Sequence, residues 1–398
     1  MKKILFVIPT MRMGGAEKAL VSLLKSLDPS QLDITLYLFE TGGILQQEIP
    51  AYVRIIEADF ITRGMLLEIR KYLWDVIKAG KFVAAYDRLK ISLRARFNRR
   101  QFAWNSVKKH IRELEGHYDV AIGFLEGVTD FFVIDKVIAD KKIGWIHTDM
   151  SKKVALDIEK KYYLQFDKLV TITDSCKNAF IKMVPEAFGK MDVIKNIVIN
   201  EEIREKADEK INFGWNENAI NIVTIGRLEY QKGIDLGIRA CNIIKKRGYN
   251  INWHVYGEGS LQAELSKMIQ ELHLSDTFIL EGLVRNPYPY MKHAEMIVQP
   301  SRNEGKSIVL DEAKILDKAI VVTDYPSVND QIEDGKTGLI TDSTPEAIAE
   351  GIIRLLQNVG LREEIEKNCK NSFDQRKSPL EDFYRLIGIA ERGDSVGL

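Results

Sequence analysis

The chain has 398 residues, of which 45% are hydrophobic and 29% charged, and its 57 Lys and Arg balance its 57 Asp and Glu. This composition is that of an ordinary globular protein, and the length favours two domains because one hydrophobic core rarely grows so large. The three cysteines are far apart and odd in number, which excludes a disulfide framework and a structural zinc site. The first apolar run ends at Pro9, too early for a signal peptide, and no window could span a membrane. We therefore expect a cytoplasmic protein.

Short apolar runs alternate with helical patterns along most of the chain. In the first half, the runs that predict strands occupy residues 4–9, 33–39, 120–125, 141–146 and 168–173. A more charged segment at 192–219 looks like an interdomain connection. Beyond it, the runs that predict strands occupy residues 220–228, 250–257, 278–284, 294–300 and 319–324. This rhythm predicts an α/β protein with two doubly wound parallel sheets, whose ligands lie beyond the carboxyl ends of the strands.

The domain limits follow from where this rhythm pauses. We predict a first domain over residues 1–195, with a basic helical insertion at about 61–115, and a second domain over residues 196–376. In residues 377–398, apolar side chains repeat at helical spacing, and we expect this helix to pack back on the first domain.

A strand-to-helix turn with the sequence GRLEYQKGID carries two cations, Arg227 and Lys232, between two glycines. Free N–H groups and partial positive charge at the start of the next helix make this turn a suitable anion site. Arginine offers a fork of donors and lysine a point charge, so the pair suits a diphosphate better than a monophosphate. The alternative is that both are solvated residues of an ordinary turn, which a generic Arg-x4-Lys pattern would favour.

The stretch SRNEGKSIVLDEA holds two glutamates, Glu304 and Glu312, eight residues apart. It is not a Walker A phosphate loop, which needs glycine where Pro300 stands. If Ser307 caps a helix that begins at Ile308, the two carboxylates are roughly 10 Å apart. That distance fits the two sugars of a nucleotide-diphosphate sugar, with helix N–H groups between them. The alternative is a pair of solvated carboxylates.

Two further strand-to-helix turns contain glycines. In GGAEK, after the first strand, Gly14 and Gly15 let the backbone approach a ligand closely. VYGEGS is not a dinucleotide fingerprint, because Gln262 stands where a third glycine is required. For both turns, a plain loop explains the glycines as well as a role in ligand binding does.

The motifs GRLEYQKGID, VYGEGS, EGLVRN, SRNEGKSIVLDEA and GKTGLI follow one another in the second half, and GGAEK and GWIHTD lie in the first. In this order and spacing they resemble the retaining, nucleotide-sugar-dependent glycosyltransferases of GT-B architecture that carry a Glu-x7-Glu motif (glycosyl transferases group 1, family 4). The resemblance covers most of the chain and is weakest from 60 to 115. It implies two facing Rossmann-like domains with a cleft between them.

The resemblance also implies roles for individual residues. Arg227 and Lys232 match the pair that holds the donor diphosphate. Glu312 matches the ribose ligand, Glu304 the glutamate near the donor sugar, and His147 a histidine near the transferred sugar. Of these, Glu304, His147, Arg227 and Lys232 form the expected catalytic set. The other donor-binding positions are Gly14 and Gly15 near the diphosphate, Val284 at the base-contacting strand end, and Gly305, Ser307 and Ile308 near the phosphate or sugar.

The implied activity is a retaining transfer from a nucleotide-diphosphate sugar, expected to be a UDP-sugar, to a lipid-linked or saccharide acceptor in bacterial cell-surface polysaccharide or glycolipid assembly. Lys306 and Ser307 depart from the aromatic or aliphatic residue and the Pro or Gly that often follow Glu-Gly in the family, which leaves the donor sugar open. The alternatives are another sugar-nucleotide enzyme of this architecture, such as an epimerase or a phosphorylase, and a non-catalytic sugar-nucleotide-binding protein.

An Asp-x-Asp pair, which holds a metal in the other major glycosyltransferase architecture, is absent from all 398 residues. Arg227, Lys232 and helix ends would then stabilise the charge that develops on the leaving diphosphate. We therefore predict no metal and no other cofactor. No general base is evident, and the leaving phosphate itself can accept the proton.

Residues 61–112 hold 14 Lys or Arg against 3 Asp or Glu, a surplus of 11. Their helical pattern places apolar residues on one face: Leu66, Ile69, Leu73, Val76 and Ile77. A basic amphipathic helix with Trp74 and Phe82 can lie on an anionic membrane surface, so we predict peripheral association with the inner face of the cell membrane. The alternative is a solvated charged face with ordinary core packing. Nucleic acid is not expected, because no binding motif or aromatic cluster accompanies the charges.

Overall fold

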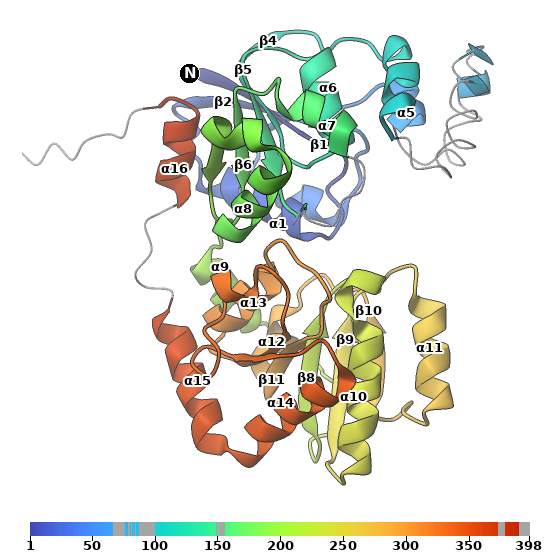
Figure 1. Cartoon of the computed structure of the whole chain (residues 1–398), viewed down its shortest axis with the longest axis vertical. Coiled ribbons are helices and arrows are strands. Elements are labelled where there is room, and N and C mark those ends of the chain that lie inside the picture. Colours follow the sequence, from blue (N-terminus) through green and yellow to red (C-terminus); the bar gives the residue numbers. More distant parts are fainter. Residues whose placement is uncertain are drawn as a thin grey trace, which may run out of the picture. The chain divides into compact units, whose positions relative to one another are not determined.

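The structure is a computed structural model that describes residues 1–66, 76–78, 80, 82–83, 85–86, 100–148, 150, 156–372 and 379–389. The chain divides into two compact units: the first contains Met1–Ile197 and Ser378–Leu398, and the second contains Val198–Lys377. Each unit is built around one parallel sheet whose strands are joined by helices (Figure 1).

A seven-stranded parallel sheet forms the centre of the first unit. In order across the sheet, its strands are β3 (Arg54–Glu57), β2 (Leu32–Leu38), β1 (Lys2–Ile8), β4 (His117–Gly123), β5 (Ile138–Ile146), β6 (Lys168–Thr171) and β7 (Met191–Val193). From Ile4 to Ile8, β1 is apolar and fully buried, as a parallel sheet covered on both faces requires. Because β1 lies between β2 and β4, the strand order reverses there, and the loops that follow β1 and β4 flank this topological switch point.

The helices of the first unit connect these strands, except for one that comes from the far end of the chain. Within the described residues they are α1 (Gly15–Ser26), α2 (Phe60–Leu66), α5 (Arg100–Val107), α6 (Val128–Lys136), α7 (Leu156–Tyr163), α8 (Asp174–Met183) and α16 (Pro379–Leu386). In α16, the ring of Phe383 lies 6.1 Å from that of Phe6 and 6.3 Å from that of Trp145. The C-terminal helix is therefore part of the first unit's apolar interior.

The second unit is built around a six-stranded parallel sheet. In order, its strands are β10 (Phe278–Gly282), β9 (Ile251–Tyr256), β8 (Ile220–Ile225), β11 (Met296–Gln299), β12 (Ala319–Thr323) and β13 (Leu339–Thr341). Its helices are α9 (Asn200–Ala207), α10 (Ile234–Lys246), α11 (Gln262–Glu271), α12 (Tyr288–His293), α13 (Ile308–Ile315), α14 (Pro345–Gln357) and α15 (Val359–Asn371). The switch point of this sheet lies between β8 and β11.

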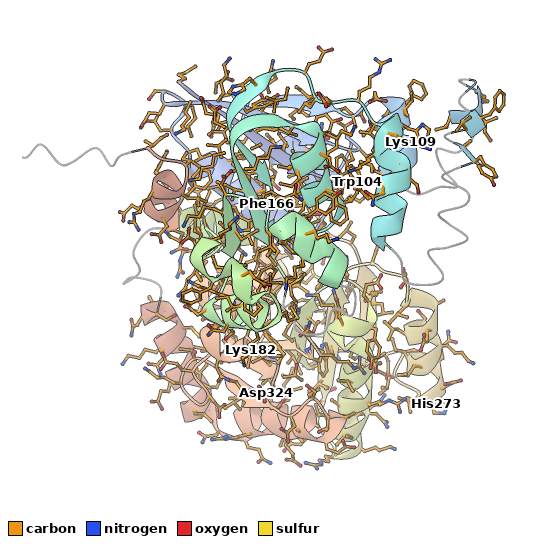
Figure 2. All side chains as sticks on the ribbon, turned by 45° about the horizontal axis from the view of Figure 1, so that its top comes forward. Trp104, Lys109, Phe166, Lys182, His273 and Asp324 are labelled. Atoms are coloured by element: carbon orange, nitrogen blue, oxygen red, sulfur yellow. The ribbon has the colours of Figure 1, made fainter. Side chains whose placement is uncertain are left out.

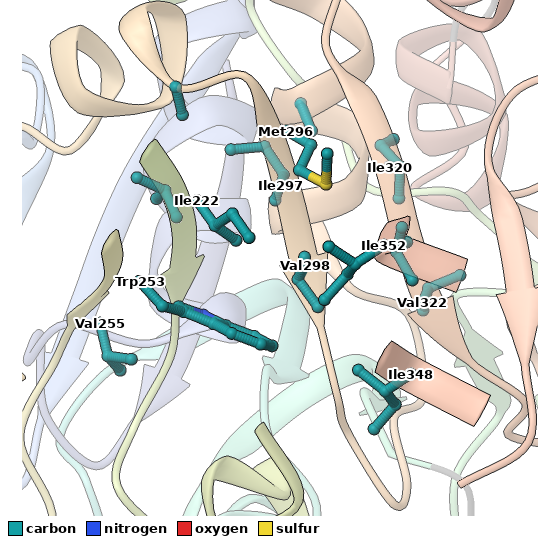
Figure 3. Close-up of a cluster of buried hydrophobic side chains, with 14 of the residues drawn as sticks. Ile222, Trp253, Val255, Met296, Ile297, Val298, Ile320, Val322, Ile348 and Ile352 are labelled. Carbon is teal, nitrogen blue, oxygen red and sulfur yellow. The ribbon is translucent and has the colours of Figure 1, made fainter. Parts of the chain in front are cut away.

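One apolar core holds the second unit together (Figure 3). Ile222, Trp253 and Val298 come from three neighbouring strands, and Ile348 and Ile352 cover them from α14. All five side chains are at most 1% exposed, and burying each contributes on the order of 1.5–3 kcal/mol to folding. The strands that carry the candidate site are thereby fixed on a rigid base.

The α/β class and the two parallel sheets predicted from the sequence are confirmed. The prediction missed three strands, β3, β7 and β13, which have only three or four residues each. The segment 192–219 is not only a connection: it contains α9, whose residues Ile203 and Ala207 are buried in the second unit's core. The units divide between Ile197 and Val198, close to the predicted limit.

The basic segment 61–112 is partly described. Val76 is fully buried in the core of the first unit, and Leu66 and Ile77 pack against that core, so these residues serve ordinary core packing. Trp104 of α5, labelled in Figure 2, is buried and donates its indole N–H to Asp135 at 2.6 Å. Phe82 is 68% exposed. The remaining positions singled out in the sequence lie outside the described residues: Ile69, Leu73 and Trp74.

Candidate functional site

Two loops of the second unit meet at the switch point of its sheet, one after β8 and one after β11. Gly233, with φ of +63°, lies so close to the second loop that an added Cβ would be 1.9 Å from the carbonyl oxygen of Pro300. This position therefore requires glycine. The guanidinium of Arg302 also joins the loops, because it pairs with Asp235 at 2.6 Å and lies 4.2 Å from the ring centre of Tyr230. Sequence reasoning missed this clamp.

The two loops bring Lys232 and Glu304 together. Their side chains form an ion pair at 2.5 Å and are only 14% and 11% exposed. The hydroxyl of Ser301 donates to the same carboxylate oxygen of Glu304 at 2.8 Å, and Ser327 donates to the Glu304 carbonyl oxygen, also at 2.8 Å. Two residues predicted from separate motifs thus share one partly buried charged site, and Glu304 is not a solvated carboxylate.

Arg227 is exposed and lies in the loop that follows β8. Hydrogen bonds from Ser260, with a smaller contribution from the charge of Arg227, lower the pKa of the neighbouring Glu229. The glycines of VYGEGS let that turn touch the Arg227 loop. An added Cβ at Gly257 would lie 2.0 Å from the Gly226 carbonyl oxygen, so a tight backbone contact accounts for this glycine.

Glu312 lies on α13 and is 1% exposed. One of its carboxylate oxygens accepts a hydrogen bond from the hydroxyl of Tyr288 at 2.9 Å. Tyr288 begins α12, four residues beyond Val284, which is half-buried and packs against the core. The structure therefore places Glu312 and Tyr288 in one polar contact next to the predicted base-contacting strand end. Tyr288 was not predicted.

The loop between the two glutamates is held by buried contacts. Ser307 occupies the N-cap position of α13. Its backbone N–H donates to the side-chain oxygen of Gln331 at 2.8 Å, so this N–H already has a hydrogen-bond partner within the protein. Its hydroxyl is buried and has no hydrogen-bond partner among the described residues. Gly305 is buried, and Ile308, the first residue of α13, is 8% exposed. The ammonium of Lys306 forms an ion pair with the carboxylate of Asp311.

In the first unit, Gly14 and Gly15 lie where β1 passes into α1. Gly14 is the N-cap, and Gly15 is the first residue of the helix. An added Cβ at Gly14 would lie 2.3 Å from a carboxylate oxygen of Glu17. That contact is with the end of a flexible side chain, which can move, so the contact does not itself require glycine at position 14. A ligand role for Gly14 and Gly15 is supported only by their position at a helix N-terminus beside the switch point.

His147 follows β5 and is 9% exposed. Its ring lies 4.8 Å from that of Phe124 and stacks at 6.3 Å on that of Trp145. Burial lowers the pKa of His147 to about 4. The negative charge of Glu126 and a hydrogen bond with the Phe124 backbone act in the opposite direction, but burial outweighs them. The imidazole is therefore neutral at neutral pH. Its Nε2 atom is buried and has no partner within the described part of the chain.

Glu126 lies beside this histidine, in the loop after β4 at the first unit's switch point. Its carboxylate accepts hydrogen bonds from the backbone N–H of His147 at 3.1 Å and from the Thr148 hydroxyl at 2.5 Å. Gly127, with φ of +104°, lets the chain turn directly into α6. Sequence reasoning missed Glu126; the only available signal was its place between a buried strand and a glycine.

Two solved structures share the fold of this chain. The chain superposes on a crystal structure of Anabaena Alr3699/HepE in complex with UDP and glucose with a TM-score of 0.69 and 16% identity, covering 98% of this chain and 99% of that one. It superposes on a crystal structure of TarM with a TM-score of 0.67 and 14% identity, covering 97% and 99%. The fold is that of the GT-B glycosyltransferases, as the sequence motifs predicted.

The sequence places the chain more closely within this class. Residues 205–372 match the family described as glycosyl transferases group 1. Alpha-D-kanosaminyltransferase of Streptomyces kanamyceticus is 30% identical over 46% of this chain and 50% of its own length. Poly(ribitol-phosphate) alpha-N-acetylglucosaminyltransferase of Staphylococcus aureus (strain COL) is 29% identical over 41% of this chain and 34% of its own length. The chain thus matches half or less of the length of these two relatives.

The described residues contain neither a candidate metal cluster nor a candidate membrane span. No group of three or more His, Cys, Asp or Glu among them is placed to hold a metal ion. In the same residues, no helix combines the length and apolar character needed to cross a membrane.

Proposed function

We propose that the chain is a glycosyltransferase that moves a sugar from a nucleotide-diphosphate sugar, by preference a UDP-sugar, to a saccharide or lipid-linked acceptor, with retention of anomeric configuration. The observation that carries this proposal is the Lys232–Glu304 ion pair at the switch point of a group 1 domain. It places a cation that suits a diphosphate beside a carboxylate that suits sugar hydroxyls. Relatives named as a poly(ribitol-phosphate) alpha-N-acetylglucosaminyltransferase and a capsular polysaccharide biosynthesis glycosyltransferase support assembly of bacterial cell-surface glycans as the setting.

The charges of the second unit fit the chemistry of this transfer. The bond between the sugar's anomeric carbon and the diphosphate oxygen breaks, a bond to the acceptor oxygen forms, and the acceptor's proton passes to the leaving diphosphate. Negative charge grows on the diphosphate, and preorganised cations and N–H groups stabilise it. Lys232, Arg227 and the first turn of α13 would supply this stabilisation, while Glu304 would shift from Lys232 to the sugar hydroxyls.

In the first unit, His147 fits a role toward a hydroxyl group. A neutral imidazole whose Nε2 atom is buried without a partner accepts a hydrogen bond from an O–H donor rather than attracting an anion. We assign acceptor binding to this unit and donor binding to the second. The ribose of the donor would meet the buried Glu312, with Tyr288 fixing that carboxylate.

The acceptor is proposed to be lipid-linked because of residues 61–112. This segment has a surplus of 11 positive charges, and its described side chains include exposed aromatic rings, Phe82 at 68% and Tyr86 at 63%. Exposed aromatic residues among Lys and Arg suit the interface of an anionic membrane. We therefore propose peripheral binding to the inner face of the cell membrane.

The decisive experiment incubates the purified chain with a panel of nucleotide sugars, with and without saccharide and membrane-lipid acceptors. Mass spectrometry then measures the products, and NMR gives the anomeric configuration. We expect nucleoside diphosphate release that requires an acceptor, and an α-linked product from an α-configured donor. Isomerised nucleotide sugar formed without an acceptor would show an epimerase instead. Binding of donors without turnover under every condition would show a non-catalytic sugar-nucleotide-binding protein.

A further inference from the structure

The loop that follows β12 holds the backbone of the Glu304 loop in place. At the end of β12, the hydroxyl of Thr323 donates to the carbonyl oxygen of Ser301 at 2.5 Å. Four residues later, the hydroxyl of Ser327 donates to the carbonyl oxygen of Glu304 at 2.8 Å. Thr323 and Ser327 are buried, so both hydrogen bonds lie in the interior of the second unit. Tyr325 stands between these two anchors in the chain, and its backbone is therefore held beside the Glu304 loop.

The side chain of Tyr325 carries a buried hydroxyl that has no hydrogen-bond partner in the part of the chain that the structure describes. The residue is only 2% exposed. Burial raises the pKa of Tyr325, and the charges of Glu304 and Asp311 raise it further, so both carboxylates act on this ring. The hydroxyl therefore keeps its proton at neutral pH and can donate. Because a buried hydroxyl without a partner is costly, a state of the site in which it donates recovers that cost.

Of the two carboxylates, Glu304 is the better acceptor for this hydroxyl. Asp311 already pairs with Lys306 through one oxygen and accepts from the amide of Gln331 through the other, at 3.3 Å. On Glu304, the ammonium of Lys232 and the hydroxyl of the serine three residues earlier both contact the same oxygen. The second oxygen of Glu304 can therefore accept another hydrogen bond.

We propose that Tyr325 is a positioning residue whose hydroxyl donates to Glu304 when the donor's diphosphate draws Lys232 away from that carboxylate. This inference rests on the proposed function. Without a replacement donor, Glu304 would lose its ammonium partner while it is only 11% exposed, which is a costly state. The exchange of Lys232 for Tyr325 holds one oxygen of Glu304 in place, so the other can meet the hydroxyls of the donor sugar. The phenol keeps its proton throughout.

The first test uses Tyr325→Phe, which removes the hydroxyl and keeps the ring. Isothermal titration calorimetry measures binding of UDP-glucose, UDP-N-acetylglucosamine, GDP-mannose and dTDP-glucose without an acceptor. We expect the variant to bind the preferred nucleotide sugar about tenfold more weakly, as loss of a hydrogen bond to a charged group predicts. The unfolding temperature of the ligand-free chain should stay unchanged or rise, because the hydroxyl removed has no partner there.

Tyr288→Phe is the matched control for stability. Its hydroxyl donates to Glu312 at 2.9 Å in the ligand-free chain, so its removal should lower the unfolding temperature. A residue with a purely structural role would behave like this control. Unchanged nucleotide-sugar binding by Tyr325→Phe, or a lower unfolding temperature of that variant without ligand, would overturn the inference.

The second test removes the ammonium without any ligand. In a Lys232→Ala chain, the hydroxyl of Tyr325 should already donate to Glu304. Adding Tyr325→Phe should then lower the unfolding temperature by about 2–4 °C, although the same change does not lower it in the wild type. Equal effects of Tyr325→Phe on the unfolding temperature in the two backgrounds would contradict the exchange of partners.

A third background separates an action through Glu304 from direct contact with the donor. In a Glu304→Gln chain the carboxylate is gone, so Tyr325→Phe should weaken nucleotide-sugar binding by less than about twofold. A tenfold loss in both backgrounds would show that the hydroxyl contacts the donor itself, and the positioning role would be wrong. A wild-type chain that binds none of the four nucleotide sugars would overturn the proposed function and this inference together, whereas equal binding by wild type and Tyr325→Phe would overturn the inference alone.

Discussion

The switch points of the two sheets carry opposite kinds of polar group. In the second unit the groups are ionised and paired: Lys232 with Glu304, and Arg302 with Asp235. In the first unit the buried imidazole of His147 is kept neutral beside the carboxylate of Glu126. Paired charges can exchange partners when an anion arrives, whereas a neutral acceptor atom suits a hydroxyl. Similar folds thus provide two different chemistries.

The largest effect should follow from Lys232→Ala. The change removes a charge-assisted contact of about 1.5–3 kcal/mol and leaves Glu304 without its ammonium partner, so kcat/KM for the donor should fall about 100-fold. Steady-state kinetics measures the change, and circular dichroism should show an intact fold. Lys245→Ala is the matched control, because it breaks an exposed pair with Asp276 in the same unit. Equal kinetics for both variants would remove Lys232 from the donor site.

The first unit should respond to pH through His147. The unfolded imidazole has a pKa of about 6.5, and burial lowers it to about 4 in the fold. Below pH 6.5 the unfolded chain binds a proton that the folded chain does not, so the free energy of unfolding falls as the pH falls from 6.5 to 4. The loss from this one group reaches about 3 kcal/mol.

Urea unfolding at several pH values tests this, with His147→Gln as the comparison. All other titrating groups are common to both proteins, so the difference between the two profiles reports His147. We expect the profiles to converge toward low pH. Profiles that stay parallel between pH 6.5 and 4 would show that His147 is not held neutral by burial.

Membrane binding should depend on the basic segment of the first unit. The positions to change to Ser are Arg94, Arg96, Arg99 and Arg100. Each Lys or Arg near an anionic surface contributes about 1 kcal/mol to membrane binding. Since only some of the four face the lipid, the affinity for anionic vesicles measured by co-sedimentation should weaken about tenfold to thirtyfold. High salt should weaken wild-type binding in the same way. Equal pelleting with neutral and anionic vesicles would favour the solvated-face interpretation and a soluble acceptor.

Arg227→Ala should have a smaller effect than Lys232→Ala, because Arg227 is exposed. We expect about a tenfold loss in donor kcat/KM at low salt, at the lower end of the range for a charge-assisted contact. If the loss equals that of Lys232→Ala at every salt concentration, the donor must bury Arg227 when it binds.

Removing divalent metal should have the smallest effect. Because cations and helix ends replace a metal in the proposed mechanism, turnover after dialysis should be unchanged in excess EDTA. Complete loss of turnover, restored by magnesium or manganese, would contradict this assignment and show that a metal ion stabilises the leaving diphosphate.

Much of the fold was predictable because it depends on local patterns. Apolar runs such as ILFVIP are buried on both faces, so hydrophobicity alone identified the longer strands. The strands β3, β7 and β13 escaped because they are short and also lie at sheet edges, where few of their residues are buried. The equally short β6 and β11 are almost fully buried, and their apolar runs were recognised. Glycine-bounded turns identified Lys232 and Glu304, since a strand end, a turn and a helix start are visible in one stretch of sequence.

Contacts between distant segments were not predictable in the same way. Arg302 reaches Asp235 across 67 residues, and Tyr288 reaches Glu312 across 24. Only the folded sheet brings these partners together. Lys306 and Asp311 are close in sequence, but their pairing depends on burial by the turn that carries Gln331, which no local pattern indicates.

The return of α16 to the first unit affects the order in which the chain can fold during synthesis. The second unit is continuous in sequence, so it can fold once its last strand and helices have left the ribosome. The first unit cannot finish until residues 379–386 follow, because the fully buried Phe383 covers Phe6. The half of the protein made first is therefore completed last, and a nascent chain that ends before α16 would expose apolar surface to chaperones.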